Sequence, residues 1–196
     1  MIRIFFTIIS LTLLSSTVWS QRDYEIGFEI TAASGSNLGG TVGGSVKFAL
    51  VDDEEWAYGP SIRYQYFWSN NSFTGINNNA SLYGGGVFVH YRFLDWFFLG
   101  TEIELLRNPF PVIDPSKPWA LTGFLGGGIS REYGNIRLNL GILYDVVDAL
   151  RDPLESNPSP LRNSYMIRRQ NPNPNAGVQG ELLPIIYRVA VFIPIG

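Results

Sequence analysis

The stretch Ile136–Asp145, IRLNLGILYD, decides the fold of this 196-residue chain. Leu138, Leu140 and Ile142 recur at every second position and alternate with small or polar residues such as Asn139. A period of two is typical of a β-strand, in which successive side chains point to opposite faces. The stretch therefore predicts a strand with one apolar face and one polar face.

The same alternation recurs in seven further segments, at residues 24–31, 42–50, 58–66, 83–92, 97–105, 119–131 and 185–195. Short turn signals join segments at 52–55, 94–95 and 132–135, and the other connections are longer, at 33–40, 68–80, 107–118 and 148–181. Strictly alternating short and long connections are typical of outer-membrane barrels, with short periplasmic turns and longer external loops. The sequence therefore predicts an all-β fold, an eight-stranded antiparallel up-and-down transmembrane β-barrel with long extracellular loops.

The distribution of charge indicates which face of the predicted barrel meets lipid. A soluble exported barrel of the lipocalin kind is the alternative, with its apolar face inside. We expect no acidic or basic residue on the apolar face, because a charge at the bilayer midplane costs several kcal/mol. The opposite face carries both signs: Lys47, Arg63, Arg92, Arg137 and Arg188 with Glu25, Glu29, Glu102, Glu104 and Asp145. The charged face is therefore expected to line the lumen.

A lumen of eight strands is only wide enough to be filled by side chains. Glu29, Arg63, Glu102 and Arg188 fall near the middle of their segments. Opposite charges in a confined space should pair, because an unpaired buried charge is costly. We expect these four residues to form an ion-pair cluster that plugs the lumen, with a narrow channel for a small solute as the alternative.

The first twenty residues have the pattern of a secretory signal peptide. Arg3 precedes an apolar run over residues 4–14, and Val18 and Ser20 stand at the −3 and −1 positions of a cleavage site. Cleavage is expected before Gln21, leaving residues 21–196 as an outer-membrane barrel domain. The apolar run is too short to span a bilayer as a helix.

Composition excludes several classes of function. The chain has no Cys and one His, so thiolate and multi-histidine metal sites are excluded, and its net charge of −3 does not favour nucleic acid. His90, the one histidine, faces the predicted lumen and is expected to be a hydrogen-bonded lumen residue. We therefore expect no cofactor, no metal and no catalytic site, and a lipid-modifying barrel enzyme that uses His90 remains the alternative.

The connection at 148–181 is far longer than usual and rich in Pro and Asn. It contains Arg162, Arg168 and Arg169, which are candidates for binding an envelope protein or lipopolysaccharide phosphates. A solvated loop without a partner is the alternative.

Four stretches carry a resemblance to a known class of proteins: 83–93 (YGGGVFVHYRF), 98–105 (FLGTEIEL), 124–129 (FLGGGI) and 187–193 (YRVAVFI). The chain resembles small outer-membrane β-barrel proteins of the Bacteroidota over essentially all of its mature length. The resemblance implies an outer-membrane location and no assigned activity, so no site residue is carried over. The expectation is a monomeric, non-enzymatic barrel in outer-membrane lipid, with a structural or partner-binding role.

Overall fold

A computed structural model describes residues 23–35, 39–71, 76–109, 116–151, 157, 159–165, 167 and 183–195. The predicted signal peptide, residues 1–20, lies outside this range, as do Arg168 and Arg169. Within the described residues no helix is long and apolar enough to cross a membrane.

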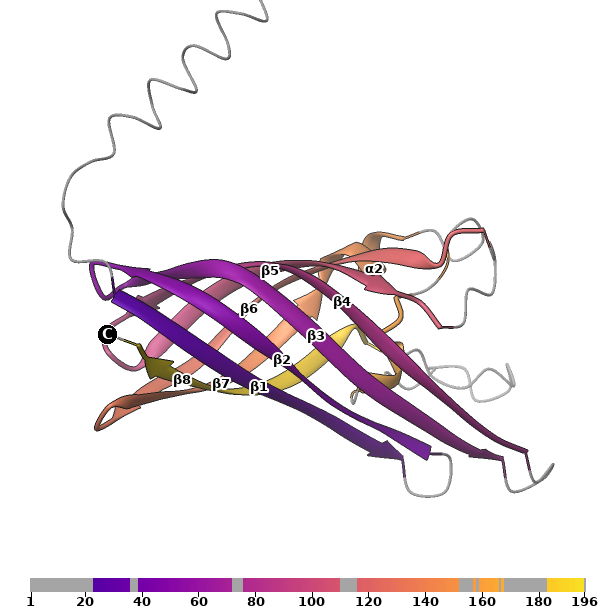
Figure 1. Ribbon diagram of the computed structural model, residues 1–196. Coiled ribbons are helices and arrows are strands. Elements are labelled where there is room, and N and C mark those ends of the chain that lie inside the picture. Colours follow the sequence, from indigo (N-terminus) through magenta and orange to yellow (C-terminus); the bar gives the residue numbers. More distant parts are fainter. Residues whose placement is uncertain are drawn as a thin grey trace, which may run out of the picture.

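Eight strands close into one antiparallel barrel, in which each strand pairs with its neighbours in chain order and β8 closes on β1 (Figure 1). The strands are β1 (Asp23–Gly35), β2 (Gly39–Asp52), β3 (Trp56–Asn71), β4 (Ile76–Phe93), β5 (Phe97–Arg107), β6 (Trp119–Tyr133), β7 (Ile136–Asp145) and β8 (Ile185–Pro194). Among the described residues between β7 and β8 there are two short helices, α2 (Val146–Leu150) and η1 (Arg162–Ser164). The predicted eight-stranded antiparallel up-and-down barrel is confirmed.

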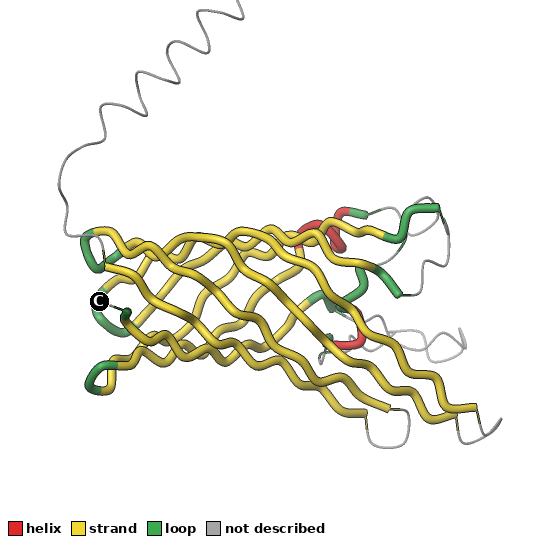
Figure 2. Tube along the Cα trace, in the orientation of Figure 1, coloured by secondary structure: helices red, strands yellow, loops and turns green. Residues whose placement is uncertain are grey.

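The two ends of the barrel differ (Figure 2). Three tight turns and the end of β8 lie at one end, here called the turn end. The helices α2 and η1, the end of β3 and the start of β4 lie at the other end, the loop end. Asp53 and Glu54 have φ values of 51° and 61°, and Leu94 and Asp95 have 54° and 55°. Positive φ at two successive turn residues suits the twist of antiparallel strands. The predicted turns at 52–55 and 94–95 therefore form as expected.

Two connections that the sequence analysis expects to be long are mostly strand. β1 and β2 remain paired out to Gly35 and Gly39, and β3 and β4 remain paired out to Asn71 and Ile76. The β3–β4 hairpin therefore projects past its neighbours at the loop end (Figure 1). The expectation was wrong because it took the end of the apolar alternation as the end of the strand. Backbone hydrogen bonds between two strands can continue where neither strand has an apolar face.

Side chains alternate strictly between the inside and the outside of the wall. β5 shows this completely, since every second side chain along its length is buried. The outward face of each strand carries large exposed apolar side chains, among them Phe28, Phe48, Ile62, Val87, Ile103, Leu125, Ile142 and Val189. Apolar residues thus surround the whole barrel.

The outward face is not free of charge, contrary to the expectation. Arg107 is the last residue of β5 at the loop end, and Arg131 lies near the end of β6 at the turn end. The guanidinium carbon of Arg107 is 5.5 Å from the ring centroid of Tyr83, and that of Arg131 is 3.0 Å from the ring centroid of Trp96. Both arginines lie at the rims, where a long side chain can cover apolar surface and keep its charge near the edge.

The interior consists of layers. A loop-end apolar layer contains Phe67, Leu82, Leu106, Phe124, Leu143, Leu161, Tyr165 and Ile186. A turn-end apolar layer contains Ala49, Val51, Ala57, Phe88, Ala190 and Phe192. The charged side chains in the middle of the strands lie between these two layers.

Candidate functional site

The middle of the barrel holds a compact group of charges, here called the charged layer: Glu29, Lys47, Arg63, Glu102, Glu104 and Arg188. These residues come from β1, β2, β3, β5 and β8, and each is at most 4% exposed. Three cations face three carboxylates, so the layer is balanced in charge when its histidine neighbour is neutral. A balanced set can be buried without leaving one charge unpaired.

Arg63 forms the best-defined contacts in the charged layer. Its Nε donates hydrogen bonds to both carboxylate oxygens of Glu104 at 3.1 and 3.0 Å, and its Nη2 donates to Glu29 Oε1 at 2.7 Å. Its Nη1 donates to Thr31 Oγ1 at 3.4 Å. The planar guanidinium therefore joins two carboxylates, a geometry that suits arginine better than lysine.

Lys47 and Arg188 complete the layer. Lys47 Nζ lies 3.0 Å from Glu29 Oε2 and also donates to Glu102. Arg188 donates to Glu102 through Nη1, and its Nε lies 3.4 Å from Glu29 Oε1. The guanidinium carbon of Arg188 is 4.4 Å from the ring centroid of Phe124, and Lys47 Nζ is 5.0 Å from that of Phe88. The charged layer thus contacts the apolar layer on each side.

His90 lies at the edge of the charged layer. Its Nε2 is 3.0 Å from Glu102 Oε1, and since an ionised carboxylate only accepts, Nε2 is the donor. The ring centroids of Phe88, Phe98 and Phe192 lie 5.0, 5.1 and 6.2 Å from that of His90, which is 3% exposed. This histidine is enclosed in the interior and does not reach the outer surface of the barrel.

Inward glycines make room for aromatic side chains. A Cβ at Gly100 would stand 2.5 Å from His90 Cδ2, and a Cβ at Gly27 would stand 2.5 Å from Phe192 Cε1. Inward aromatic residues were not expected from the sequence. These aromatic residues lie on the same inward strand face as the charged residues, so the interior of the barrel is only partly polar.

Little space remains beside the charged layer. A cavity of about 10 Å³ lies between residues that include Glu29, His90, Glu102 and Arg188. That volume holds at most about one water molecule. The charged layer and the two apolar layers therefore leave little room for solvent in this part of the lumen.

Residues 159–165, here called the mouth segment, fold into the loop end of the barrel. Leu161 is 1% exposed and Tyr165 is 6% exposed, and both belong to the loop-end apolar layer. Gln65 Nε2, on β3, donates to Ser164 Oγ at 2.6 Å. This part of the predicted long loop is therefore packed against the barrel.

Two aspartates hold the mouth segment. Asp145 Oδ2 accepts hydrogen bonds from Ser159 Oγ and Tyr165 Oη, each at 3.0 Å. Asp148 Oδ2 accepts from Tyr165 Oη at 3.2 Å and from Arg162 Nε at 2.9 Å. Burial and the nearby charge of Asp145 raise the pKa of Tyr165 well above its ordinary value, so its hydroxyl keeps the proton that it donates.

All four predicted lumen residues lie in the charged layer. Arg63 contacts Glu29, and Arg188 contacts both Glu29 and Glu102. Of the predicted loop arginines, Arg162 is paired with Asp148, whereas Arg168 and Arg169 lie outside the described residues.

Lys47 and Glu104 were on the predicted lumen face but were not assigned to the cluster. Glu104 lies near the end of its segment, 97–105, whereas Lys47 lies as near the middle of 42–50 as Arg63 does of 58–66. Barrel strands are tilted and staggered, so position along a strand is a poor measure of depth. Two further pairs lie near the turn end, where Arg92 Nη1 donates to Glu25 Oε1 at 3.0 Å and Arg137 Nη2 donates to Glu132 Oε2 at 2.9 Å. Asp145, the last of the predicted inward charges, holds the mouth segment at the loop end.

Fold and interior together define a class: an eight-stranded antiparallel barrel with an apolar outer wall and a filled, ion-paired interior. Comparisons with protein-family models and with curated protein sequences found no match to the chain. The resemblance to small outer-membrane proteins of the Bacteroidota therefore stays a prediction. No group of three or more His, Cys, Asp or Glu side chains within the described residues could hold a metal ion.

Proposed function

We propose that this protein is an integral outer-membrane β-barrel protein, exported by the signal peptide at residues 1–20 and cleaved before Gln21. One observation carries the proposal: the outer wall is apolar on all sides, with Ile30 64%, Ile62 63% and Leu125 61% exposed. Soluble monomers rarely expose contiguous apolar patches larger than a few hundred Å². A closed apolar wall around a charged interior suits a barrel whose solvent is lipid.

Aromatic side chains at both ends support the same arrangement. Tyr24, Trp56 and Trp96 are exposed near the turn end, and Tyr83 and Trp119 are exposed near the loop end. Tyr and Trp are enriched where membrane meets water, because one part of each ring system is apolar and the other polar. In the proposed orientation the turn end faces the periplasm and the loop end faces outward.

The filled interior supports a non-enzymatic role without a channel. The charged layer is buried and balanced, and the adjoining cavity holds at most about one water molecule. His90 is enclosed by three phenylalanine rings and bonded to Glu102, so a lipid substrate at the outer wall has no access to it.

The loop end is the part of the proposed barrel that a partner would meet. The mouth segment is anchored by Asp145 and Asp148, so it provides a fixed base for the rest of the connection at 148–181. We propose a structural or partner-binding role for a monomeric barrel, the partner being an envelope protein or lipopolysaccharide.

Cell fractionation with N-terminal sequencing tests the location. The proposal expects the protein in the outer-membrane fraction, resistant to alkaline extraction, with Gln21 as its first residue. A barrel should also migrate differently on a gel before and after boiling. Recovery of a soluble periplasmic protein would refute the proposal, whatever its first residue.

A further inference from the structure

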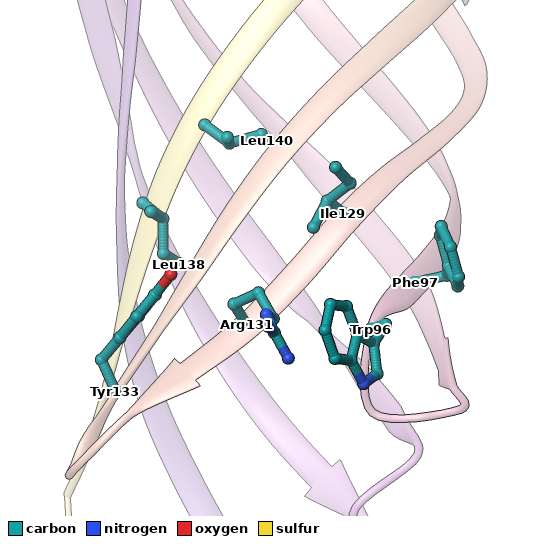
Figure 3. A pocket seen from close by; sticks show the side chains of 7 residues that line it. All are labelled: Trp96, Phe97, Ile129, Arg131, Tyr133, Leu138 and Leu140. Carbon is teal, nitrogen blue, oxygen red and sulfur yellow. The ribbon is translucent and has the colours of Figure 1, made fainter.

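A pocket of about 270 Å³ lies on the outer wall near the turn end, here called the wall pocket (Figure 3). Its residues come from β5, β6, β7 and the turn before β5. None of them points into the lumen, so the wall pocket is separate from the charged layer.

The wall pocket changes in polarity along the barrel axis. Ile129 on β6 pairs with Phe97 on β5 and Leu140 on β7, so these three form an apolar row across the wall. The next row toward the turn end contains Arg131, opposite Leu138, and Trp96 lies beside it. The pocket is therefore apolar toward the middle of the wall and cationic at its rim.

Arg131 is held in place without a carboxylate. Its guanidinium carbon lies 3.0 Å from the centroid of the Trp96 ring. Figure 3 shows the two side chains next to each other. Among the described residues no acid pairs with Arg131, since its neighbour Glu132 is paired with Arg137 at 2.9 Å. The guanidinium of Arg131 therefore keeps donors for an anionic group, and the planar fork of an arginine matches the oxygens of a phosphate.

We infer that the wall pocket binds a phospholipid with a net anionic headgroup, whose phosphate contacts Arg131 and whose acyl chain lies against Ile129, Phe97 and Leu140. This inference rests on the proposed membrane location and adds a ligand class to it. The charge and the polarity gradient match one such lipid, whose headgroup lies at the membrane edge and whose chain points to the bilayer centre. The leaflet concerned is the one at the turn end.

Arg107 provides a matched control for Arg131. It is also an outward arginine over an aromatic ring, at 5.5 Å from Tyr83, but it lies at the opposite rim and does not line the wall pocket. Replacing either residue removes one outward-facing positive charge from the wall. Only Arg131 should affect a lipid bound in the pocket.

Native mass spectrometry tests the inference. The protein is reconstituted into nanodiscs with equal amounts of phosphatidylglycerol and phosphatidylcholine, released, and its bound lipids are counted. The wild-type protein should retain phosphatidylglycerol over phosphatidylcholine by about fivefold, the preference expected for one arginine near an anionic headgroup. Arg131→Gln should reduce the ratio to about one, whereas Arg107→Gln should leave it unchanged.

A second variant keeps the positive charge of Arg131 but fills the apolar part of the wall pocket. Ile129→Trp should fill the apolar row and also abolish the preference, and gel mobility before boiling verifies that each variant is a folded barrel. The inference is wrong if the wild-type protein retains both lipids equally, or if Arg131→Gln and Arg107→Gln reduce the lipid ratio by the same amount. It is also wrong if the wild-type protein carries no lipid because a second copy of the chain covers the pocket. Failure of the wild type to enter nanodiscs would instead refute the proposed function.

Discussion

The inner and outer faces of the barrel are built from the same strands by opposite rules. Glu102 is 2% exposed and its neighbour Ile103 is 50% exposed; Arg188 is 4% exposed and its neighbour Val189 is 43% exposed. Inside, the charged layer is tolerated because each of its carboxylates has a cationic partner. Outside, apolar side chains touch only their neighbours on the wall, and no second layer of described residues covers them. The difference shows that inward residues depend on specific partners, whereas outward residues depend on the surrounding solvent.

The largest expected loss of stability comes from removing one cation of the charged layer. Arg188→Ala leaves three buried carboxylates, Glu29, Glu102 and Glu104, with two cations. Removing one partner of a buried ion pair costs about 3–5 kcal/mol. Reversible unfolding in lipid should show a loss of that size. Arg107→Ala, which removes an outward arginine at the rim, should cost below about 1 kcal/mol. Similar losses for the two variants would contradict the assignment of faces.

Substitutions on the outer face should lower the stability of the barrel for a different reason. Val189→Arg places a charge near the middle of the proposed lipid face and should cost about 2–4 kcal/mol in a bilayer. Tyr24→Arg introduces the same charge near the rim and should cost less, because the side chain can reach water. Unfolding of both variants in the same vesicles measures the difference. Equal costs at the two depths would show that the wall does not lie across a bilayer.

The mouth segment belongs to a loop, but like the inward residues of the strands it depends on specific partners. Tyr165→Phe removes the hydrogen bonds to Asp145 and Asp148 and should cost about 1.5–3 kcal/mol, as for hydrogen bonds to charged groups. Tyr64 is the control, because its hydroxyl bonds Ser81 on the exposed outer face. Tyr64→Phe should change the free energy of unfolding little. A loss at Tyr165 no greater than at Tyr64 would mean that the mouth segment is not anchored.

A double-mutant cycle sharpens the account of the charged layer. Arg188 Nε lies 3.4 Å from Glu29 Oε1, and both residues have other partners in the layer. Arg188→Ala and Glu29→Ala should show a coupling energy of about 1 kcal/mol, since part of the first loss is recovered when the opposing charge is gone. A coupling energy near zero would show that this pair is not energetically linked.

Period-two alternation was enough to predict the fold, because stretches such as Ile136–Asp145 specify a strand and its two faces. It also indicated the lumen face of Glu29 and Arg188. It could not predict depth, so Glu104 was not assigned to the cluster, and Lys47 was left out although it lies near the middle of its segment. Strand tilt and stagger arise from closure of the barrel and leave no local signal in the sequence.

Other features escaped prediction because they depend on contacts between distant residues. The inward side chains of Phe124 and Phe192 form apolar layers that no single strand reveals. Tyr165 enters the barrel mouth through hydrogen bonds to Asp145 and Asp148. Arg131 lies on the outward face with Ile129, as the pairing of β6 with β7 shows, but its contact with Trp96 joins β6 to the turn before β5 and has no local signal in the sequence.

Lipid contact around the outer wall is the central claim, and spin labelling measures it directly. The chain has no cysteine, so single cysteines can be introduced and labelled at Ile62, Ile103, Leu125 and Val189, with Asp53 in a turn as the aqueous control. In reconstituted vesicles, labels at the four wall positions should collide readily with dissolved oxygen and rarely with a water-soluble nickel complex. Nickel accessibility at the wall positions as high as at Asp53 would contradict the account.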